Sequence, residues 1–240
     1  LIAPDHYLLR MLYSQGIRMA DMGIAKQSGT EANESIADPR QAWRVFANHA
    51  HLFRGTPTGF WLNHVFSEIF SLSEQLDETN ADDYFDRISE QLQKDELRPR
   101  EIFDQSKIEF LATTESPIDT LQHHEKIRQS NWNGTVVTTY RPDCVVDPEH
   151  HAFKESLATF GQLTEEDVYS WHGYLSAHRK KRAEFIALGT TASDHGHATP
   201  RTANLTPKAS EALFHRILAD HVSSEDAELF RAQMLTEMAR

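Results

Sequence analysis

Residues 107–141 read KIEFLATTESPIDTLQHHEKIRQSNWNGTVVTTYR. The two ends of this stretch, at 107–114 and 135–140, are rich in β-branched and apolar residues and predict two strands. The residues between them, at 117–128, are typical of a helix. Two strands joined by so long a connection run parallel, because an antiparallel pair needs only a short turn. The stretch therefore predicts an α/β fold.

The chain before this stretch shows almost only helical patterns. Apolar side chains recur at helical spacing, and a proline such as Pro39 stands where a helix is expected to begin. We expect helices at 6–16, 39–53, 60–72 and 80–93, with a turn at 54–59. Residues 1–104 are therefore predicted to form a mostly helical region, and residues 105–240 to carry the strands. Together they are expected to make one incomplete domain.

Beyond residue 141 the pattern alternates again. A helical region follows Pro148, is interrupted near Gly161 and resumes after residues 164–167, where a threonine with an acid three positions later is typical of a helix start. Residues 185–189 read FIALG and predict a third strand. We expect two last helices at 206–219 and 224–240.

Three parallel strands with long crossovers predict an arc of a barrel, because three strands cannot close one. The chain has 240 residues, close to the roughly 250 of a whole (β/α)₈ barrel, so its length alone does not show whether the barrel is complete. The chain begins without Met, and its last helix stops without a capping signal. We expect the chain to be an internal piece of a longer protein.

The chain is acidic: 24 Lys and Arg residues stand against 36 Asp and Glu, a net charge of −12. This balance argues against binding to nucleic acid or to an anionic membrane surface, because both need a basic patch. A small anionic substrate stays compatible with it, since a few convergent cationic side chains outweigh the overall field at short range.

The numbers of cysteines, long apolar runs and histidines restrict the location of the protein and the kinds of site it can hold. The chain has one cysteine, Cys144, which excludes an internal disulfide and favours a cytoplasmic location. It has no apolar run of about 18 residues to cross a membrane. Its 14 histidines raise the expectation of a metal or acid–base site.

Polar residues stand directly after each predicted strand. In α/β folds the C-terminal ends of parallel strands carry the chemistry, so we expect these residues to converge on one rim. They are Glu115, Arg141, Asp143, Asp194 and His195. Structural roles compete with this interpretation, since Arg141 could brace a loop through Asp143 and Asp194 could cap a turn.

Four segments of the chain resemble those of the uronate isomerases, a family of the amidohydrolase superfamily. DHYLLRMLYSQG at the start resembles its D-H-Y-x-x-R-x-M-x-x-x-G segment, and LATTESPIDTLQHHEKI resembles TTDDP-x-D-x-L-x-x-H. TTYRPD resembles W/F-R-P-D, and TASDHGH resembles S-D-H. Each match alone is weak, but the four stand in family order with family-like spacing and together cover nearly the whole chain.

The resemblance implies a fold and a reaction. The fold would be a distorted (β/α)₈ barrel with a helical insertion in its N-terminal half, where the helical first hundred residues would lie. The reaction would interconvert D-glucuronate with D-fructuronate, and D-galacturonate with D-tagaturonate, by proton transfer between C2 and C1. The partner would be a small sugar acid, and a homo-oligomer stays open.

The resemblance also assigns site residues. Tyr7, Asp194 and His195 would be catalytic, while His6 and Arg141 would bind the substrate, Arg141 as a clamp on a carboxylate or hydroxyl. A divalent metal, zinc by first expectation, would sit on a His-x-His pair and an acid outside this chain. Within the chain, His195 alone would come near it.

Several points depart from this picture. Glu115 and Ser116 replace two paired acids of the family, and the effect of that change stays open. His49 and His51 form a His-x-His pair on a predicted helix, where the two side chains diverge. A second such pair, His195 and His197, follows a strand and has a geometry that could bind metal. Two alternative functions also stay open: a metal-dependent hydrolase of the same superfamily, and an inactive truncated piece or interaction module.

Overall fold

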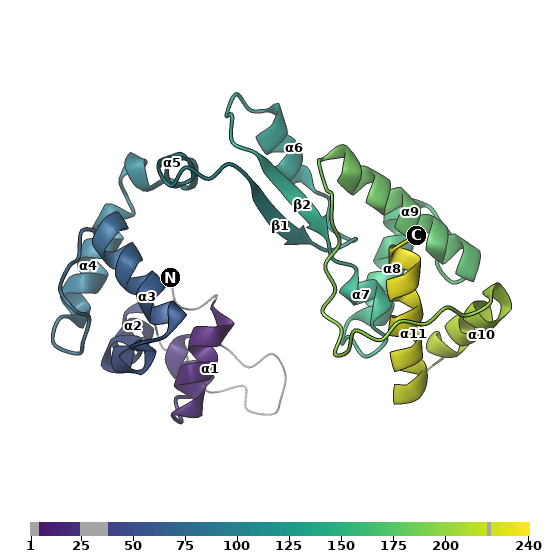
Figure 1. Ribbon diagram of the computed structural model, residues 1–240, viewed down its shortest axis with the longest axis horizontal. Helices are drawn as coiled ribbons and strands as arrows, with labels where there is room; N and C mark the ends of the chain where they lie inside the picture. The colour runs from purple at the N-terminus through teal and green to yellow at the C-terminus, as the bar shows by residue number, and fades with distance from the viewer. Residues whose placement is uncertain (1–4, 25–37, 220–221) are drawn as a thin grey trace. The chain divides into compact units, whose positions relative to one another are not determined.

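The computed structural model describes residues 5–24, 38–219 and 222–240 (Figure 1). The chain divides into two compact units, Leu1–Gln105 and Ser106–Arg240. In the described residues, the first unit forms helices without a strand, and the second combines helices with a small parallel sheet.

The described residues of the first unit form five α-helices. They are α1 (His6–Ser14), α2 (Pro39–Asn48), α3 (Pro57–His64), α4 (Ala81–Gln91) and α5 (Pro99–Gln105). Single turns of 3₁₀ helix lie at Met19–Met22, Ala50–Phe53 and Asp95–Leu97, and a π-helical turn lies at Val65–Ile69. The helices predicted in this region are confirmed, except that the expected turn at 54–59 is shorter, because Thr56 already caps α3.

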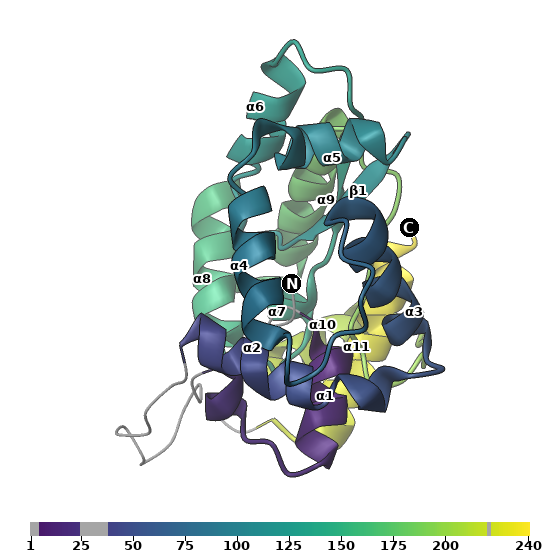
Figure 2. The same ribbon diagram turned by 90° about the vertical axis from the view of Figure 1, so that its left-hand side faces the viewer.

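Aromatic side chains hold this unit together. Trp43 of α2 meets the ring of Phe66 edge-on, with 6.1 Å between centroids, and Phe66 meets Tyr84 of α4 in the same way at 5.5 Å. The indole of Trp43 also donates a hydrogen bond to the carbonyl of Ala81, at 2.8 Å. These contacts pack α4 against α2 (Figure 2). They satisfy the one polar group that the buried indole carries.

Two strands and six helices lie in the described part of the second unit. These are β1 (Leu111–Glu115), α6 (Gln122–Gln129), β2 (Val136–Tyr140), α7 (Asp143–Val146), α8 (Phe153–Thr164), α9 (Trp171–Ala187), α10 (Pro207–Ile217) and α11 (Ser224–Met238). The strands pair in parallel, from Leu111 beside Val136 to Glu115 beside Tyr140. The predicted parallel pair and its crossover helix are confirmed.

The first strand differs from its prediction in length and burial. Residues 107–110 lie outside it, and Leu111 keeps 41% of its surface exposed. The reason is that helices α6 and α9 pack mainly against β2, while α6 reaches β1 through His124, whose Nε2 lies 2.8 Å from Thr113 Oγ1. The apolar composition of 107–114 therefore does not mark a strand that is buried within this unit.

The third predicted strand is wrong. Residues 185–187 continue α9, and the helix ends at Ala187, two residues before Gly189, which has a φ of +98°. The apolar run is buried for another reason: the ring of Phe185 packs edge-on against Tyr140, 5.0 Å between centroids. Instead, Ser193 forms a parallel bridge with Tyr140, so the loop after α9 lies beside β2 where a third strand was expected (Figure 1).

Two helix boundaries were also wrong. Helix α8 continues through Gly161, where an added Cβ would come within 2.8 Å of the Val168 side chain. Residues 164–167 do not begin a helix, because Thr164 ends α8 and Glu165 adopts a left-handed φ of 57°. Helix α9 begins at Trp171 and is capped by Ser170, which accepts from the amide of Gly173.

The core of the second unit lies between α8, α9, α10 and α11. Tyr174 stacks on Phe214 with 4.7 Å between ring centroids, and its hydroxyl donates to the carbonyl of Val145 at 2.8 Å. The predicted starts of α10 and α11 are confirmed, each capped by a hydroxyl, that of Thr206 or Ser223. Of the helices in the described residues, none combines the length and apolar character needed to span a bilayer.

Candidate functional site

The candidate site lies beyond the C-terminal end of β2. The amide of Asp194 donates to the carbonyl of Tyr140 at 3.0 Å, which anchors the loop after α9 to the strand end. The amide of Arg141 donates to the carbonyl of Glu115 at 2.9 Å, which anchors the segment after β2 to β1. Residues 194–197, which we call the His loop, therefore lie beside Arg141 and Asp143.

Arg141 holds two carboxylates of this site. Its Nε lies 2.7 Å from Asp143 Oδ2, and its Nη1 lies 3.3 Å from Asp194 Oδ2. The hydrogen bond to Asp143 raises the pKa of the guanidinium, whose charge is fixed in any case. Both carboxylate oxygens of Asp143 also accept from the amide of Gly196 at 3.0 Å. Asp143 therefore links the segment after β2 to the His loop.

The two histidines of the His loop lie close together and are half-buried. Their ring centroids are 5.3 Å apart. The Nε2 of His195 lies 3.2 Å from Ser193 Oγ, while its Nδ1 and both ring nitrogens of His197 are shielded from solvent without a hydrogen-bond partner among the described residues. Burial lowers the pKa of both imidazoles, so both are neutral near pH 7. Neutral rings can accept a proton or bind a metal.

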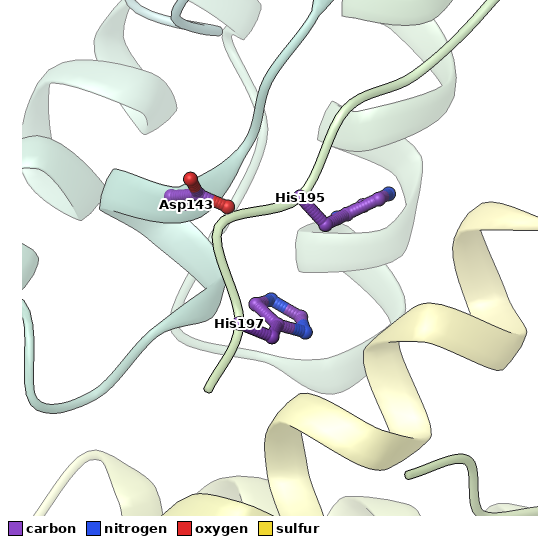
Figure 3. A group of neighbouring side chains, drawn as sticks. All are labelled: Asp143, His195 and His197. Carbon is purple, nitrogen blue, oxygen red and sulfur yellow. The ribbon is translucent and has the colours of Figure 1, made fainter. Parts of the chain in front are cut away.

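A nitrogen of each ring and a carboxylate oxygen of Asp143 lie within 4.8 Å of one another. Figure 3 shows the three side chains around one bend of the His loop, with Asp143 projecting from the start of α7. The sequence had singled out His195 as the one residue of the chain near a metal. The structure adds Asp143, with a suitable ligand atom, to the pair of His195 and His197 that the sequence offered as a possible metal pair.

Glu115 and Ser116, which replace two acids of the resembled pattern, point to different partners. The hydroxyl of Thr138 donates to Glu115, and the Nε2 of His124 lies 3.6 Å from Glu115 Oε1. The hydroxyl of Ser116 lies 3.0 Å from the sulfur of Cys144, whose pKa is raised by burial. The buried thiol is therefore protonated at neutral pH and is a poor nucleophile.

The predicted site residues divide between the two units. Arg141, Asp194 and His195 are brought together in the second unit. His6 and Tyr7 begin α1 in the first unit, with their rings 4.3 Å apart and Tyr7 67% exposed. Both lie in the first turn of a helix capped by Asp5, which accepts from the amide of Tyr7 at 2.9 Å.

The whole of this chain, residues 1–240, matches the family model of glucuronate isomerase. The chain belongs to the glucuronate isomerase family. The family resemblance inferred from the four segments is therefore confirmed.

Curated members of the family are similar over the whole chain. The uronate isomerase of Phenylobacterium zucineum is 56% identical over 239 residues, which are 100% of this chain and 49% of that protein. The uronate isomerase of Caulobacter vibrioides is 53% identical over 240 residues, again 100% of this chain and 48% of that protein. This chain thus spans about half the length of the curated family members it matches.

Solved structures of the family give the same picture. The crystal structure of glucuronate isomerase from Caulobacter crescentus aligns with a TM-score of 0.93 and 53% identity, over 100% of this chain and 49% of that one. That of uronate isomerase from Thermotoga maritima aligns with a TM-score of 0.84 over 98% of this chain and 50% of that one. At 22% identity, the second likeness supports the fold alone.

The sequence contained signals for Asp143 and His197 that a search for single residues passes over. Asp143 was expected at the rim beside Arg141, and His197 as half of a His-x-His pair, but the two were not joined in one site. Both become candidate ligands because the bridge at Ser193 places the His loop beside the start of α7.

Proposed function

We propose that this chain is part of a uronate isomerase, which interconverts D-glucuronate with D-fructuronate and D-galacturonate with D-tagaturonate. The family match over residues 1–240 carries this proposal. The cluster of Arg141, Asp194 and His195 supports it, because an anionic sugar needs a cation and groups that exchange protons. The activity belongs to the whole protein, and we expect this chain alone to be inactive.

We propose that β1, β2 and the bridge at Ser193 are an arc of a distorted (β/α)₈ barrel. The first unit would be the helical insertion of that barrel. The family's divalent metal, zinc by first expectation, would rest on a His-x-His pair and an acid supplied from outside these 240 residues. When bound, such a metal polarises a sugar oxygen as a Lewis acid.

Arg141 is proposed to bind the substrate carboxylate. Its contact with Asp194 is 3.3 Å long, against 2.7 Å for Asp143. An incoming carboxylate would therefore displace Asp194 more readily than Asp143. Asp194, once released, is free to accept a hydrogen bond from a sugar hydroxyl, while Asp143 keeps the guanidinium oriented.

His195 is proposed to take part in the proton transfer between C2 and C1. Burial lowers the pKa of its imidazole, so at neutral pH the ring is unprotonated and can accept a proton. Tyr7 and His6, from the first unit, are proposed to bind sugar oxygens: a phenol donates to an alkoxide-like oxygen, and an imidazole holds a hydroxyl.

The sugar acid is the only partner that we propose. The acidic net charge of −12 disfavours nucleic acid, and a single cysteine together with metabolic relatives supports a cytoplasmic location.

The test is the isomerisation of D-glucuronate and D-galacturonate, followed by NMR. It is run with this chain and with its reading frame extended in both directions, each with added Zn²⁺. Ketose formed by the extended protein supports the proposal. Hydrolysis of sugar lactones without uronate turnover would instead assign a hydrolase, and no turnover of either would leave an inactive protein.

The role of Arg141 is tested in the active protein. Arg141→Lys keeps the charge but loses the paired donors of the guanidinium, so we expect KM for D-glucuronate to rise about tenfold or more with a smaller change in kcat. Arg179→Lys, an exposed position on α9, is the matched control and should leave both constants unchanged. An unchanged KM in Arg141→Lys would show that Arg141 does not bind the substrate carboxylate.

A further inference from the structure

The His loop contains polar atoms without hydrogen-bond partners in the described residues. Both ring nitrogens of His197 and the Nδ1 of His195 are shielded from solvent with none. A buried polar group without a partner costs roughly 1–3 kcal/mol, and native structures contain few of them. Three such nitrogens on two residues of one short loop point to a ligand that the rings bind.

The nearest group that complements these nitrogens is the carboxylate of Asp143. It lies at the start of α7, and its two oxygens accept from the amide of Gly196 and from Arg141. A carboxylate has about four lone-pair positions, so these contacts leave room for a further bond. A ring nitrogen of His195, a ring nitrogen of His197 and an oxygen of Asp143 lie within 4.8 Å of one another (Figure 3).

We propose that Asp143, His195 and His197 form a binding site for a divalent transition metal, of the class to which Zn²⁺ and Co²⁺ belong. Two imidazole nitrogens and one carboxylate oxygen are a set of ligands typical of these ions. The site lies within this chain and is therefore separate from the metal that the family resemblance places on ligands outside it. It shares His195 with the proposed function and goes beyond it, because the isomerisation was proposed with no metal at the His loop.

The charges around the site are compatible with a cation. Arg141 is the cation nearest to Asp143, but its guanidinium also contacts Asp194. Two carboxylates therefore surround one fixed positive charge.

Glycine at position 196 allows the His loop to approach its partners closely. A Cβ there would lie 2.7 Å from an oxygen of Asp143 and 2.7 Å from Nη2 of Arg141. The absence of a side chain between the two histidines thus lets the backbone amide reach the carboxylate. On binding, the ligand atoms would move from their present spacing toward a metal with bonds of about 2.0–2.2 Å, so we expect the side chains to rotate.

A metal at this position would tie two segments together. One is the His loop, which carries Asp194, and the other is the start of α7, which follows Arg141. The bond would fix the spacing between Arg141 and Asp194, two residues of the candidate site. The metal would therefore stabilise the position of the His loop, and its removal should make that loop more mobile.

The test is titration of this 240-residue chain, stripped of metal with a chelator, with Co²⁺. Co²⁺ bound by two imidazoles and a carboxylate gives visible absorption bands, and Zn²⁺ should displace it and abolish them. We expect one Co²⁺ per chain. His197→Ala and Asp143→Asn should weaken binding at least tenfold, whereas His215→Ala, an exposed histidine on α10, should bind as the unchanged chain does.

A second measurement needs no variant. The ring signals of His195 and His197 in NMR spectra should shift on addition of Zn²⁺, and those of His215 should not. No Co²⁺ bands in the unchanged chain, or equal affinity in His197→Ala, would overturn the site. Neither readout depends on uronate turnover, so a protein that isomerises uronates without metal at the His loop would refute this inference and leave the proposed function standing.

Discussion

An ion pair of the first unit and one of the second differ in burial and in the distance they span along the sequence. In the first unit, Arg44 of α2 lies 2.9 Å from Asp82 of α4, and both side chains are 51% exposed. In the second unit, Arg231 of α11 has a side chain only 9% exposed, and it joins carboxylates that lie up to 84 residues away in sequence. The exposed pair lies on helices that already pack through their apolar faces. The buried arginine instead joins segments that are distant in sequence.

The position of Arg231 explains why this difference matters for the candidate site. Its guanidinium contacts Asp147 at 2.7 Å and Glu149 at 2.7 Å, and it reaches Glu228 at 3.2 Å. Asp147 directly follows α7, and Asp143 is the first residue of that helix. The buried arginine therefore fixes one end of α7, and the candidate metal ligand stands at the other. In this unit the site depends on contacts between distant segments, which local sequence signals do not encode.

The largest expected effect comes from removing this buried charge. Arg231→Ala leaves three carboxylates facing one another, and we expect the second unit to lose roughly 3 kcal/mol of stability, the scale for breaking a buried ion pair. Hydrogen exchange followed by mass spectrometry reads the two units separately through their own peptides.

The matched control is Arg44→Ala in the first unit, where solvent already screens the pair. We expect little measurable change in its exchange. If Arg231→Ala and Arg44→Ala lowered the stability of their units by similar amounts, the difference between the two ion pairs would be refuted. Arg231→Met, which keeps the length of the stem, separates the charge from the packing of the side chain.

The next effect concerns a buried histidine of α9. The Nδ1 of His178 lies 2.8 Å from the hydroxyl of Tyr140, and the residue is fully buried. Burial, with nearby Arg182 and His195, lowers its pKa from 6.5 to about 3. Below pH 6.5 this histidine binds a proton in the unfolded chain but not in the folded chain. It therefore leaves the free energy of unfolding unchanged above pH 6.5 and lowers it as the pH falls toward 3.

The expected slope is about 1.4 kcal/mol per pH unit, or roughly 2 kcal/mol lost between pH 6.5 and pH 5. Urea unfolding of the second unit at pH 7, 6 and 5 measures it. His178→Gln, which keeps a polar partner for Tyr140, should flatten the slope, whereas His172→Gln, exposed on the same helix, should leave it unchanged. A slope that persists in His178→Gln would assign the acid sensitivity to other groups.

The contrast between local contacts and contacts between distant segments also explains which elements the sequence predicts. The helices that begin at Pro39, Pro207 and Ser224 were predicted because each cap lies within a few residues of the groups it serves. The strand expected at 185–189 was wrong because its apolar run is equally typical of a buried helix end, and only the contact of Phe185 with Tyr140 decides between them.

The candidate site was predicted in part for a similar reason. Arg141, Asp194 and His195 were singled out from the strand ends and the family resemblance, and the structure brings them together, although their roles stay proposals. The group of Asp143 with the two half-buried imidazoles was not predicted. It depends on a bend at Gly196 and on a bridge formed by Ser193, a residue without any strand signal.

The smallest expected effect tests a kind of contact that both units share, the side-chain cap of a helix. Asp38 caps α2 by accepting from the amide of Gln41 at 2.8 Å, and Ser223 caps α11 by accepting from the amide of Asp226 at 3.1 Å. Each serves a helix end that otherwise leaves amides unpaired. We expect Asp38→Ala and Ser223→Ala to cost about 1 kcal/mol each, read as faster exchange in the first turn of the affected helix.

Equal losses would mean that capping is local in both units, and that the difference between them lies in their buried charges alone. Asp38→Asn keeps the hydrogen bond and removes the charge, so it should cost less than Asp38→Ala. A loss well above 2 kcal/mol in Ser223→Ala, spreading from α11 to the peptides of α7, would show that the cap also positions Arg231. In that case even a local sequence signal would help to position the candidate site.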